Sequence, residues 1–253
     1  MNINNILQMN RAGLLALDPK AVNGLLTAEE VIHMATVLGA FWVYDYDAAG
    51  KGRVGLHALL RSLLHSNGFF ISRIFLDNLN IRRIIARQMV MRLQIAGLPV
   101  DIDYVAGIPD SATALGESVG EILGVPVASM RKVDGRMTLA GEIRDGANVL
   151  LVEDFCTRGT GFTEAVLEVK GKNPHVNFAP YYPVIINRSD MRKLSIAGYG
   201  DFKIVAVVEK KIQDWDSGVC PLCKMGSKPI KPKTPEENWQ LLMTSQFAQT
   251  SLE

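Results

Sequence analysis

The sequence predicts an α/β fold in which a central parallel sheet is flanked by helices. From about residue 100 onward, strand-like runs alternate with helical runs, and this alternation is typical of a parallel α/β sheet. Residues 149–152 (Val-Leu-Leu-Val) form a continuous apolar run, as expected for a strand covered on both faces. A chain of 253 residues, 48% apolar and 21% charged, can bury the core of one sizeable α/β domain.

The first elements precede this alternating region. Residues 27–43 are predicted to form a helix, because Thr27 can cap its start and apolar residues recur at helical spacing. A polar, glycine-rich loop is expected at 44–55 and a short strand at 69–72. Residues 78–96 predict a long helix with an apolar side and a solvated, arginine-rich face.

The alternating region supplies the sheet. Strands are expected at 101–106, 125–129, 148–152, 181–187 and 203–208, with helices at 112–123 and 161–170. The chain after 209 is rich in Lys, Pro and Gly and ends in a candidate short helix at 235–248. We therefore divide the chain into an N-terminal helical element (1–70), an α/β core (71–210) and a C-terminal tail (211–253).

Charge and hydropathy limit the class of protein. The formal net charge of +1 does not favour a nucleic-acid binder. No apolar run reaches membrane-spanning length, and the N-terminus lacks the features of a signal peptide. We expect a cytoplasmic protein that binds neither nucleic acid nor membranes.

The three cysteines are too few for a disulfide scaffold. Cys220 and Cys223 have the spacing of a zinc knuckle, but the chain has no second cysteine pair, and the histidines show no ligand spacing. A metal shared between two subunits is one interpretation. A reduced pair in a tight turn is the interpretation that we favour.

The segment after the apolar run carries the chemistry. Glu153 and Asp154 follow the buried strand, and then Thr157, Arg158, Gly159, Thr160 and Gly161 lead into a helix. Ligands of open α/β sheets bind at the carboxyl ends of strands. The N–H groups of such a loop and of the helix start favour a phosphate, whereas adjacent acids suit vicinal hydroxyls. The segment therefore predicts a site for a sugar phosphate with a free diol.

This segment resembles the phosphoribosyl-pyrophosphate (PRPP) signature of the type I phosphoribosyltransferases. The resemblance implies the phosphoribosyltransferase-type sheet with an N-terminal hood over the base. It also implies that Glu153 and Asp154 face the ribose hydroxyls and that residues 157–161 hold the 5′-phosphate. Phe155, Cys156, Arg158 and Gly161 depart from the residues common in that signature.

Four further segments resemble the orotate branch of that family. Arg61 would contact PRPP, Phe69 and Phe70 would line the base site with Thr157, and Gly107-Ile108-Pro109 would form the pyrophosphate loop. Arg131 and Lys132 would contact the pyrophosphate, in part across a dimer interface. Arg188 would hold the orotate carboxylate, for which a planar bidentate contact is suited. Core packing of the two Phe residues, and an ion pair of Arg188 with Asp190, are the alternatives.

Two departures concern catalysis. The orotate branch has a lysine in the pyrophosphate loop and a Lys-x-His-Gly in a mobile loop. Here residues 110–114 and 133–147 contain neither that lysine nor that histidine. We expect 133–147 to be a mobile lid with Gly135 and Gly141 as hinges, in which Arg136, with Arg131 and Lys132, replaces the missing lysine.

The resemblance implies an orotate phosphoribosyltransferase-like enzyme. It would join PRPP and orotate to give orotidine 5′-phosphate and pyrophosphate, as in pyrimidine nucleotide synthesis, with Mg²⁺ bound through the pyrophosphate and Asp154 at the catalytic centre. A homodimer is expected. The alternatives are a phosphoribosyltransferase for another base and a non-catalytic PRPP-binding regulatory protein.

Overall fold

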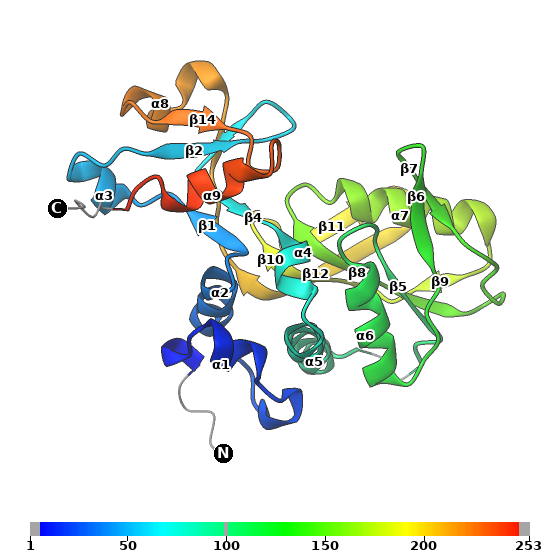
Figure 1. Ribbon diagram of the computed structural model, residues 1–253. Coiled ribbons are helices and arrows are strands. Elements are labelled where there is room, and N and C mark those ends of the chain that lie inside the picture. Colours follow the sequence, from blue (N-terminus) through cyan, green and yellow to red (C-terminus); the bar gives the residue numbers. More distant parts are fainter. Residues whose placement is uncertain (1–5, 99–100, 248–253) are drawn as a thin grey trace. The chain divides into compact units, whose positions relative to one another are not determined.

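The computed structural model describes residues 6–98 and 101–247. The chain divides into two compact units (Figure 1). The first, called the core unit here, comprises the segment up to Val37 together with Ser72–Lys211. The second, called the hood unit, comprises Leu38–Ile71 together with the segment from Ile212 onward.

The core unit contains the expected central sheet. Its strand order is β11-β12-β10-β8-β5, with β9 paired to β8, and the pairs β5–β8, β8–β10 and β10–β12 are parallel. The strands are β5 (Tyr104–Gly107), β8 (Asn148–Cys156), β9 (Asn177–Phe178), β10 (Tyr181–Asn187), β11 (Lys193–Ile196) and β12 (Gly200–Glu209). Among the described strands of this sheet, β11 alone is antiparallel, at one edge. The mostly parallel α/β architecture is therefore confirmed.

Helices cover both faces of this sheet. α7 (Thr160–Lys172) buries Phe162, Ala165, Val166 and Val169 in a cluster with Val149, Leu151, Tyr182, Val184 and Phe202. On the other face, α5 (Leu79–Ala96) contacts β10 and β12, while α6 (Thr113–Leu123) contacts α5 and β5. The predicted bounds of α5 are confirmed by its caps, since Asn78 accepts from the Ile81 N–H and Gly97 ends the helix at φ 95°.

The N-terminal part of the core unit consists of η1 (Ile6–Gln8), α1 (Arg11–Leu15), η2 (Pro19–Ala21) and α2 (Ala28–Val37), with α4 (Ser72–Leu76) preceding α5. Thr27 caps α2 reciprocally: its Oγ1 accepts from the Glu30 N–H at 3.1 Å, and Glu30 accepts from the Thr27 N–H at 2.7 Å. The predicted helix 27–43 is confirmed as far as Val37 and is wrong beyond it. Residues 41–43 form a strand, because Phe and Trp there pack on another strand of the hood unit.

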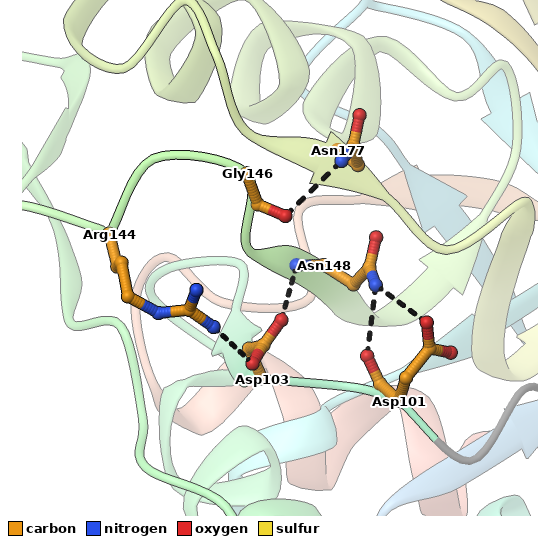
Figure 2. A network of polar contacts seen from close by, with 6 residues as sticks. All are labelled: Asp101, Asp103, Arg144, Gly146, Asn148 and Asn177. Atoms are coloured by element: carbon orange, nitrogen blue, oxygen red, sulfur yellow. Dashed lines mark hydrogen bonds and ion pairs between the residues drawn. The ribbon is translucent and has the colours of Figure 1, made fainter.

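A polar network fixes the start of β8 (Figure 2). Asp103 accepts from the Asn148 backbone N–H at 2.8 Å and from Arg144 at 2.6 Å. The Asn148 side chain donates to Asp101, and Asn177 donates to the Gly146 carbonyl at 3.3 Å. These contacts anchor the amino end of β8 to the segment before β5 and to the start of β9.

Two strand predictions in the core unit need correction. Residues 125–129 form no strand and contribute one isolated bridge, between Val105 and Val127. β8 continues four residues beyond the predicted end at 152, because β10 pairs with it through Cys156. The long segment before β8 forms a hairpin of β6 (Met130–Val133) and β7 (Arg136–Leu139).

The hood unit is mainly β. A two-stranded sheet joins β1 (Phe41–Val43) and β4 (Gly68–Phe70), and a four-stranded sheet has the order β13-β3-β2-β14. These strands are β2 (Leu56–Leu59), β3 (His65–Ser66), β13 (Asp214–Trp215) and β14 (Lys228–Ile230). The helices are α3 (Tyr46–Gly50), η3 (Ser217–Val219), α8 (Pro221–Lys224) and α9 (Glu237–Thr244). The predicted loop 44–55 thus includes one short helix, and residue 248 of the predicted last helix lies outside the described residues.

The C-terminal segment is integral to the hood unit. Its β13 and β14 pair with β3 and β2, and the Trp239 indole N–H donates to the Gly39 carbonyl at 2.8 Å. Leu222 and Leu242 are fully buried in a cluster with Trp42 and Tyr44. The contacts thus place residues 6–37 with the core unit and the C-terminal segment with the hood, whereas the three-part division expected from the sequence stays a prediction.

Candidate active site

The loops of the candidate site leave the same edge of the central sheet. β5 pairs with β8 up to Gly107 and Val152, and the Ile108 N–H donates to the Val152 carbonyl at 2.8 Å. On the other side of β8, the Arg188 N–H donates to the Cys156 carbonyl at 3.0 Å. The loops after β5, β8 and β10 therefore begin next to one another at the carboxyl ends of parallel strands, where α/β folds bind ligands.

The Thr/Gly loop after β8 has the geometry of an anion site. Gly159 precedes the first turn of α7 at φ 70°, and a Cβ on it would lie 2.6 Å from Leu194. The positive φ therefore favours glycine here, and a side chain would also have to displace the end of Leu194. Thr157, Arg158 and Thr160 are exposed around this turn. The N-terminal N–H groups of α7 and the hydroxyls of the loop can together face a phosphate.

The structure separates the two acids of the signature. Glu153 accepts a short hydrogen bond from the Tyr182 hydroxyl, and its side chain lies against the first turn of α7. A Cβ on Gly161 would lie 2.4 Å from Glu153 Oε1. Successive side chains of a strand point to opposite faces, so Asp154 projects away from this contact. The half-buried Asp154 carboxylate accepts from the Phe155 N–H at 3.0 Å.

The electrostatics of Glu153 follow from this burial. Desolvation raises the pKa of Glu153 from 4.5 to about 8, against the opposing effect of the Tyr182 hydrogen bond. Asp154 raises the pKa further, whereas the positive charge of Lys132 lowers it. Burial, followed by the negative charge of Glu153, also raises the pKa of the Tyr182 hydroxyl. Tyr182 therefore stays protonated and donates to the acid.

The loop after β5 is shaped by close backbone approach. A Cβ on Gly107 would lie 2.1 Å from the Ala112 carbonyl oxygen, and one on Gly116 would lie 2.5 Å from the Gly107 nitrogen. Both positions therefore require glycine. The chain turns tightly from β5 into α6 beside the Thr/Gly loop, where the pyrophosphate loop was predicted.

The β6–β7 hairpin brings cations to this region. Arg131, Lys132 and Arg136 are exposed on it, and the charge of Lys132 reaches Glu153. The hairpin is tied to α7 at its base: the Leu139 N–H donates to Glu168 at 2.8 Å, and Lys172 donates to the Leu139 carbonyl at 2.7 Å.

The expectation that all of 133–147 is a mobile lid is therefore corrected. Leu139, Ile143 and Ala147 are buried in the main core cluster, and the Ile143 N–H donates to Asn173 at 3.0 Å. This packing holds the second half of the segment against α7. The part that projects is the turn at Asp134 and Gly135.

Arg188 leaves the carboxyl end of β10 in a shaped turn. The preceding Asn187 is buried, accepts from the backbone and hydroxyl of Ser189, and donates to the Met191 carbonyl at 2.9 Å. Asparagine supplies both donor and acceptor here, which an aspartate could not. Asp190, the expected partner of Arg188 in the alternative interpretation, pairs with Lys211 at 2.8 Å.

The remaining predicted site residues belong to the hood unit. Arg61 is exposed in the turn between β2 and β3. Phe70 is buried and packs edge-on against Phe41, with ring centroids 6.3 Å apart. Phe69 is half-buried, and its ring packs against Trp239 with Lys233 Nζ 5.8 Å from its centroid. Core packing therefore accounts for Phe70, whereas Phe69 keeps part of its ring accessible.

The chain was compared with known proteins. No family model matches it. It is 29% identical over 186 residues to the orotate phosphoribosyltransferase of Wolinella succinogenes, covering 70% of this chain and 88% of that protein. It is 26% identical over 208 residues to the orotate phosphoribosyltransferase of Thermoanaerobacter sp., covering 81% and 96%. This chain is a homologue of the orotate phosphoribosyltransferases. The family resemblance noted in the sequence is thus confirmed.

Among solved structures, the orotate phosphoribosyltransferase of Aeropyrum pernix superimposes with a TM-score of 0.48 at 17% identity, covering 71% of this chain and 93% of that chain. Among residues 6–98 and 101–247, no helix combines the length and the apolar character needed to cross a membrane.

One residue of this phosphoribosyltransferase homologue was missed in the sequence. Tyr182 is fully buried beneath α7, where it contacts Phe162 and donates to Glu153. In sequence it is one apolar-looking position in the run of β10, and only the parallel pairing of β8 and β10 brings it to the acid. The available signal was a tyrosine, whose hydroxyl needs a hydrogen-bond partner, at a core position of the neighbouring strand.

Proposed function

We propose that this chain catalyses the transfer of the phosphoribosyl group of PRPP to orotate. The proposal rests on one observation. At the carboxyl ends of the parallel strands, the acid pair of β8, the Gly159 turn and the start of α7 lie together. The curated relatives of this chain carry the name of that activity. In the reaction, a ring nitrogen of orotate forms a bond to the anomeric carbon while the bond from that carbon to pyrophosphate breaks.

The two acids have different parts in this proposal. Asp154 binds the ribose hydroxyls, because its carboxylate is half-buried at the strand end. Glu153 is a positioning residue: through Tyr182 and Gly161 it fixes the first turn of α7 relative to β8. Residues 157–161 then hold the 5′-phosphate through N–H groups and hydroxyls.

The cationic hairpin stabilises the departing pyrophosphate. Arg131, Lys132 and Arg136 supply positive charge where negative charge develops, which lowers the barrier most effectively in a water-excluded site. The described residues gather no cluster of three or more carboxylates, so Mg²⁺, which prefers oxygen ligands, would be held mainly by the phosphate oxygens of PRPP. Bound there, it would neutralise the leaving group.

Arg188 holds the orotate carboxylate, since a guanidinium matches a planar carboxylate bidentately. Its backbone is fixed by the Asn187 turn and by β8. Arg61, Phe69 and Phe70 remain proposed contacts on the strength of the resemblance, with Phe69 the better ring-packing candidate. The proposal includes a cytoplasmic homodimer.

The test is pyrophosphate release by the purified protein with PRPP, Mg²⁺ and a panel of bases. We expect release with orotate and far less with uracil, which lacks the carboxylate. Equal rates for the two bases would remove the orotate assignment and leave a phosphoribosyltransferase for another base.

A second candidate is a non-catalytic PRPP-binding protein. The observation that favours it is that residues 110–114 contain no lysine, while residues 133–147 carry arginines instead of the lysine and histidine of the resembled loop. Binding of PRPP in calorimetry, without pyrophosphate release for any base, would establish this alternative.

A further inference from the structure

Four metal-ligating side chains converge inside the hood unit. His57, His65, Cys220 and Cys223 each offer one ligand atom, and these four atoms all lie within 4.8 Å of one another. His57 and His65 come from β2 and β3, respectively. Cys220 directly precedes α8, and Cys223 lies within it. The histidines show no ligand spacing in the sequence, because only the hood fold brings these distant segments together. The reduced cysteine pair stays a prediction.

The spacing of these atoms matches a tetrahedral site. Cys223 Sγ lies 3.3 Å from His65 Nδ1 and 3.6 Å from His57 Nε2, and Cys220 Sγ lies 3.8 Å from His57 Nε2. The two nitrogens are 2.9 Å apart. Zinc bond lengths place tetrahedral ligands about 3.5 Å apart for nitrogen and sulfur, and about 3.3 Å apart for two nitrogens. Small adjustments of the side chains therefore suffice to enclose an ion.

Hydrogen bonding outside the cluster orients one of these ligands. The Ser227 hydroxyl donates its proton to the Gly55 carbonyl at 3.1 Å, so Ser227 Oγ can accept from His57 Nδ1, which lies 2.9 Å away. The proton of His57 is thereby placed on Nδ1, and the lone pair of Nε2 faces the cysteines. This arrangement, a ligating histidine whose other nitrogen donates to a fixed acceptor, is typical of metal sites.

Burial and donor chemistry select the ion. His57, His65 and Cys220 are buried, and Cys223 is partly covered. Two thiolates and two imidazoles in tetrahedral spacing favour zinc over the oxygen-preferring ions magnesium and calcium. We propose that this Cys₂His₂ cluster binds one structural zinc ion within each chain.

The ion would cross-link two segments of the hood unit that are distant in sequence. The hood unit is built from Leu38–Ile71 and the C-terminal segment from Ile212 onward, which are joined by short strand pairs and one small apolar cluster. Units of this size commonly need a metal or disulfides because their cores are small. Zinc would link β2 and β3 to α8 and so hold the C-terminal segment in place.

The first test uses the wild-type protein. Purified without added chelator, it should contain one equivalent of zinc by inductively coupled plasma mass spectrometry. Replacement by Co²⁺ should give thiolate-to-metal charge-transfer bands and the intense visible bands of tetrahedral cobalt. Titration with a thiol reagent under native conditions should show Cys220 and Cys223 protected until a strong chelator is added. Less than a tenth of an equivalent of zinc after incubation with ZnCl₂, with no effect of chelator on thiol reactivity, would overturn the proposal.

Variants then assign the ligands. Cys223→Ser and His57→Gln should each lose most of the bound zinc and lower the thermal midpoint of unfolding. Cys156→Ser and His175→Gln are matched controls outside the cluster and should keep full zinc content. If a cluster variant does not fold, the cobalt spectrum and thiol protection of the wild type still decide. Full zinc retention in both cluster variants would refute the assignment.

Discussion

The half-buried Glu153 carboxyl makes the stability of the fold depend on pH. Its pKa is raised from 4.5 to about 8, chiefly by burial. Between these values the folded protein holds a proton that the unfolded chain has lost, so the free energy of unfolding falls as pH rises through this window. At 1.36 kcal/mol per pKa unit, the full effect is on the order of 3–5 kcal/mol above pH 8.

Glu153→Gln should abolish this slope. The amide keeps the size of the acid, and its oxygen can accept from the Tyr182 hydroxyl, so it reproduces the protonated side chain at every pH. We expect the variant to match the wild type near pH 5 and to exceed its unfolding free energy by a few kcal/mol at pH 9.

The assay is urea unfolding followed by circular dichroism at pH 5, 7 and 9. Glu117→Gln is the matched control, because it removes the same charge from an exposed position in α6 that does not contribute to the pKa shift of Glu153. If the free energy of unfolding changed with pH equally in the wild type and in Glu153→Gln, the raised pKa of this acid would be refuted.

Four further predictions concern the site. Asp154→Asn should weaken PRPP binding at least tenfold in calorimetry without altering the thermal midpoint; unchanged affinity would remove the diol assignment. Arg188→Ala should cost roughly 2–4 kcal/mol of orotate binding, and a smaller loss for orotate than for uracil would contradict its role. Arg136→Ala should lower kcat by up to about a hundredfold with PRPP binding little changed; a wild-type rate would leave Arg136 as a solvated charge. Gly161→Ser should destabilise the protein by about 1–3 kcal/mol through overpacking against Glu153. An unchanged midpoint of urea unfolding would contradict this and show that the turn adjusts to the added side chain.

The parts of the fold that the sequence predicted were those with local signals. The bounds of α5 follow from Asn78 and Gly97, which act as caps within one turn of the helix. β10 was placed correctly at 181–187, because a continuous apolar run marks a strand covered on both faces. The parallel sheet followed from the alternation of such runs with helices.

The errors occurred where tertiary contacts decide. Residues 41–43 continue a helical pattern in sequence, yet they pair with β4 because Phe41 packs on Phe70. Residues 125–129 lie beside β5, but their pairing stops at the single bridge between Val127 and Val105, so no ladder forms. The same limit explains His57 and His65: two histidines eight positions apart show no ligand spacing until a hairpin and the C-terminal segment bring them to the cysteines.

The departure of Gly161 from the family signature has a structural cause in this chain. In the resembled signature a small hydroxyl residue is common at this position, and its loss looks like the loss of a phosphate donor. Here Glu153 Oε1 would lie 2.4 Å from any Cβ at 161, because Tyr182 holds the acid against the first turn of α7. Glycine at 161 and the half-buried acid are thus parts of one arrangement. In the proposed site, the donors left for a phosphate are the N–H groups of the helix start and the exposed hydroxyls of Thr157 and Thr160. We therefore expect the backbone of the turn to contribute most of the phosphate contacts.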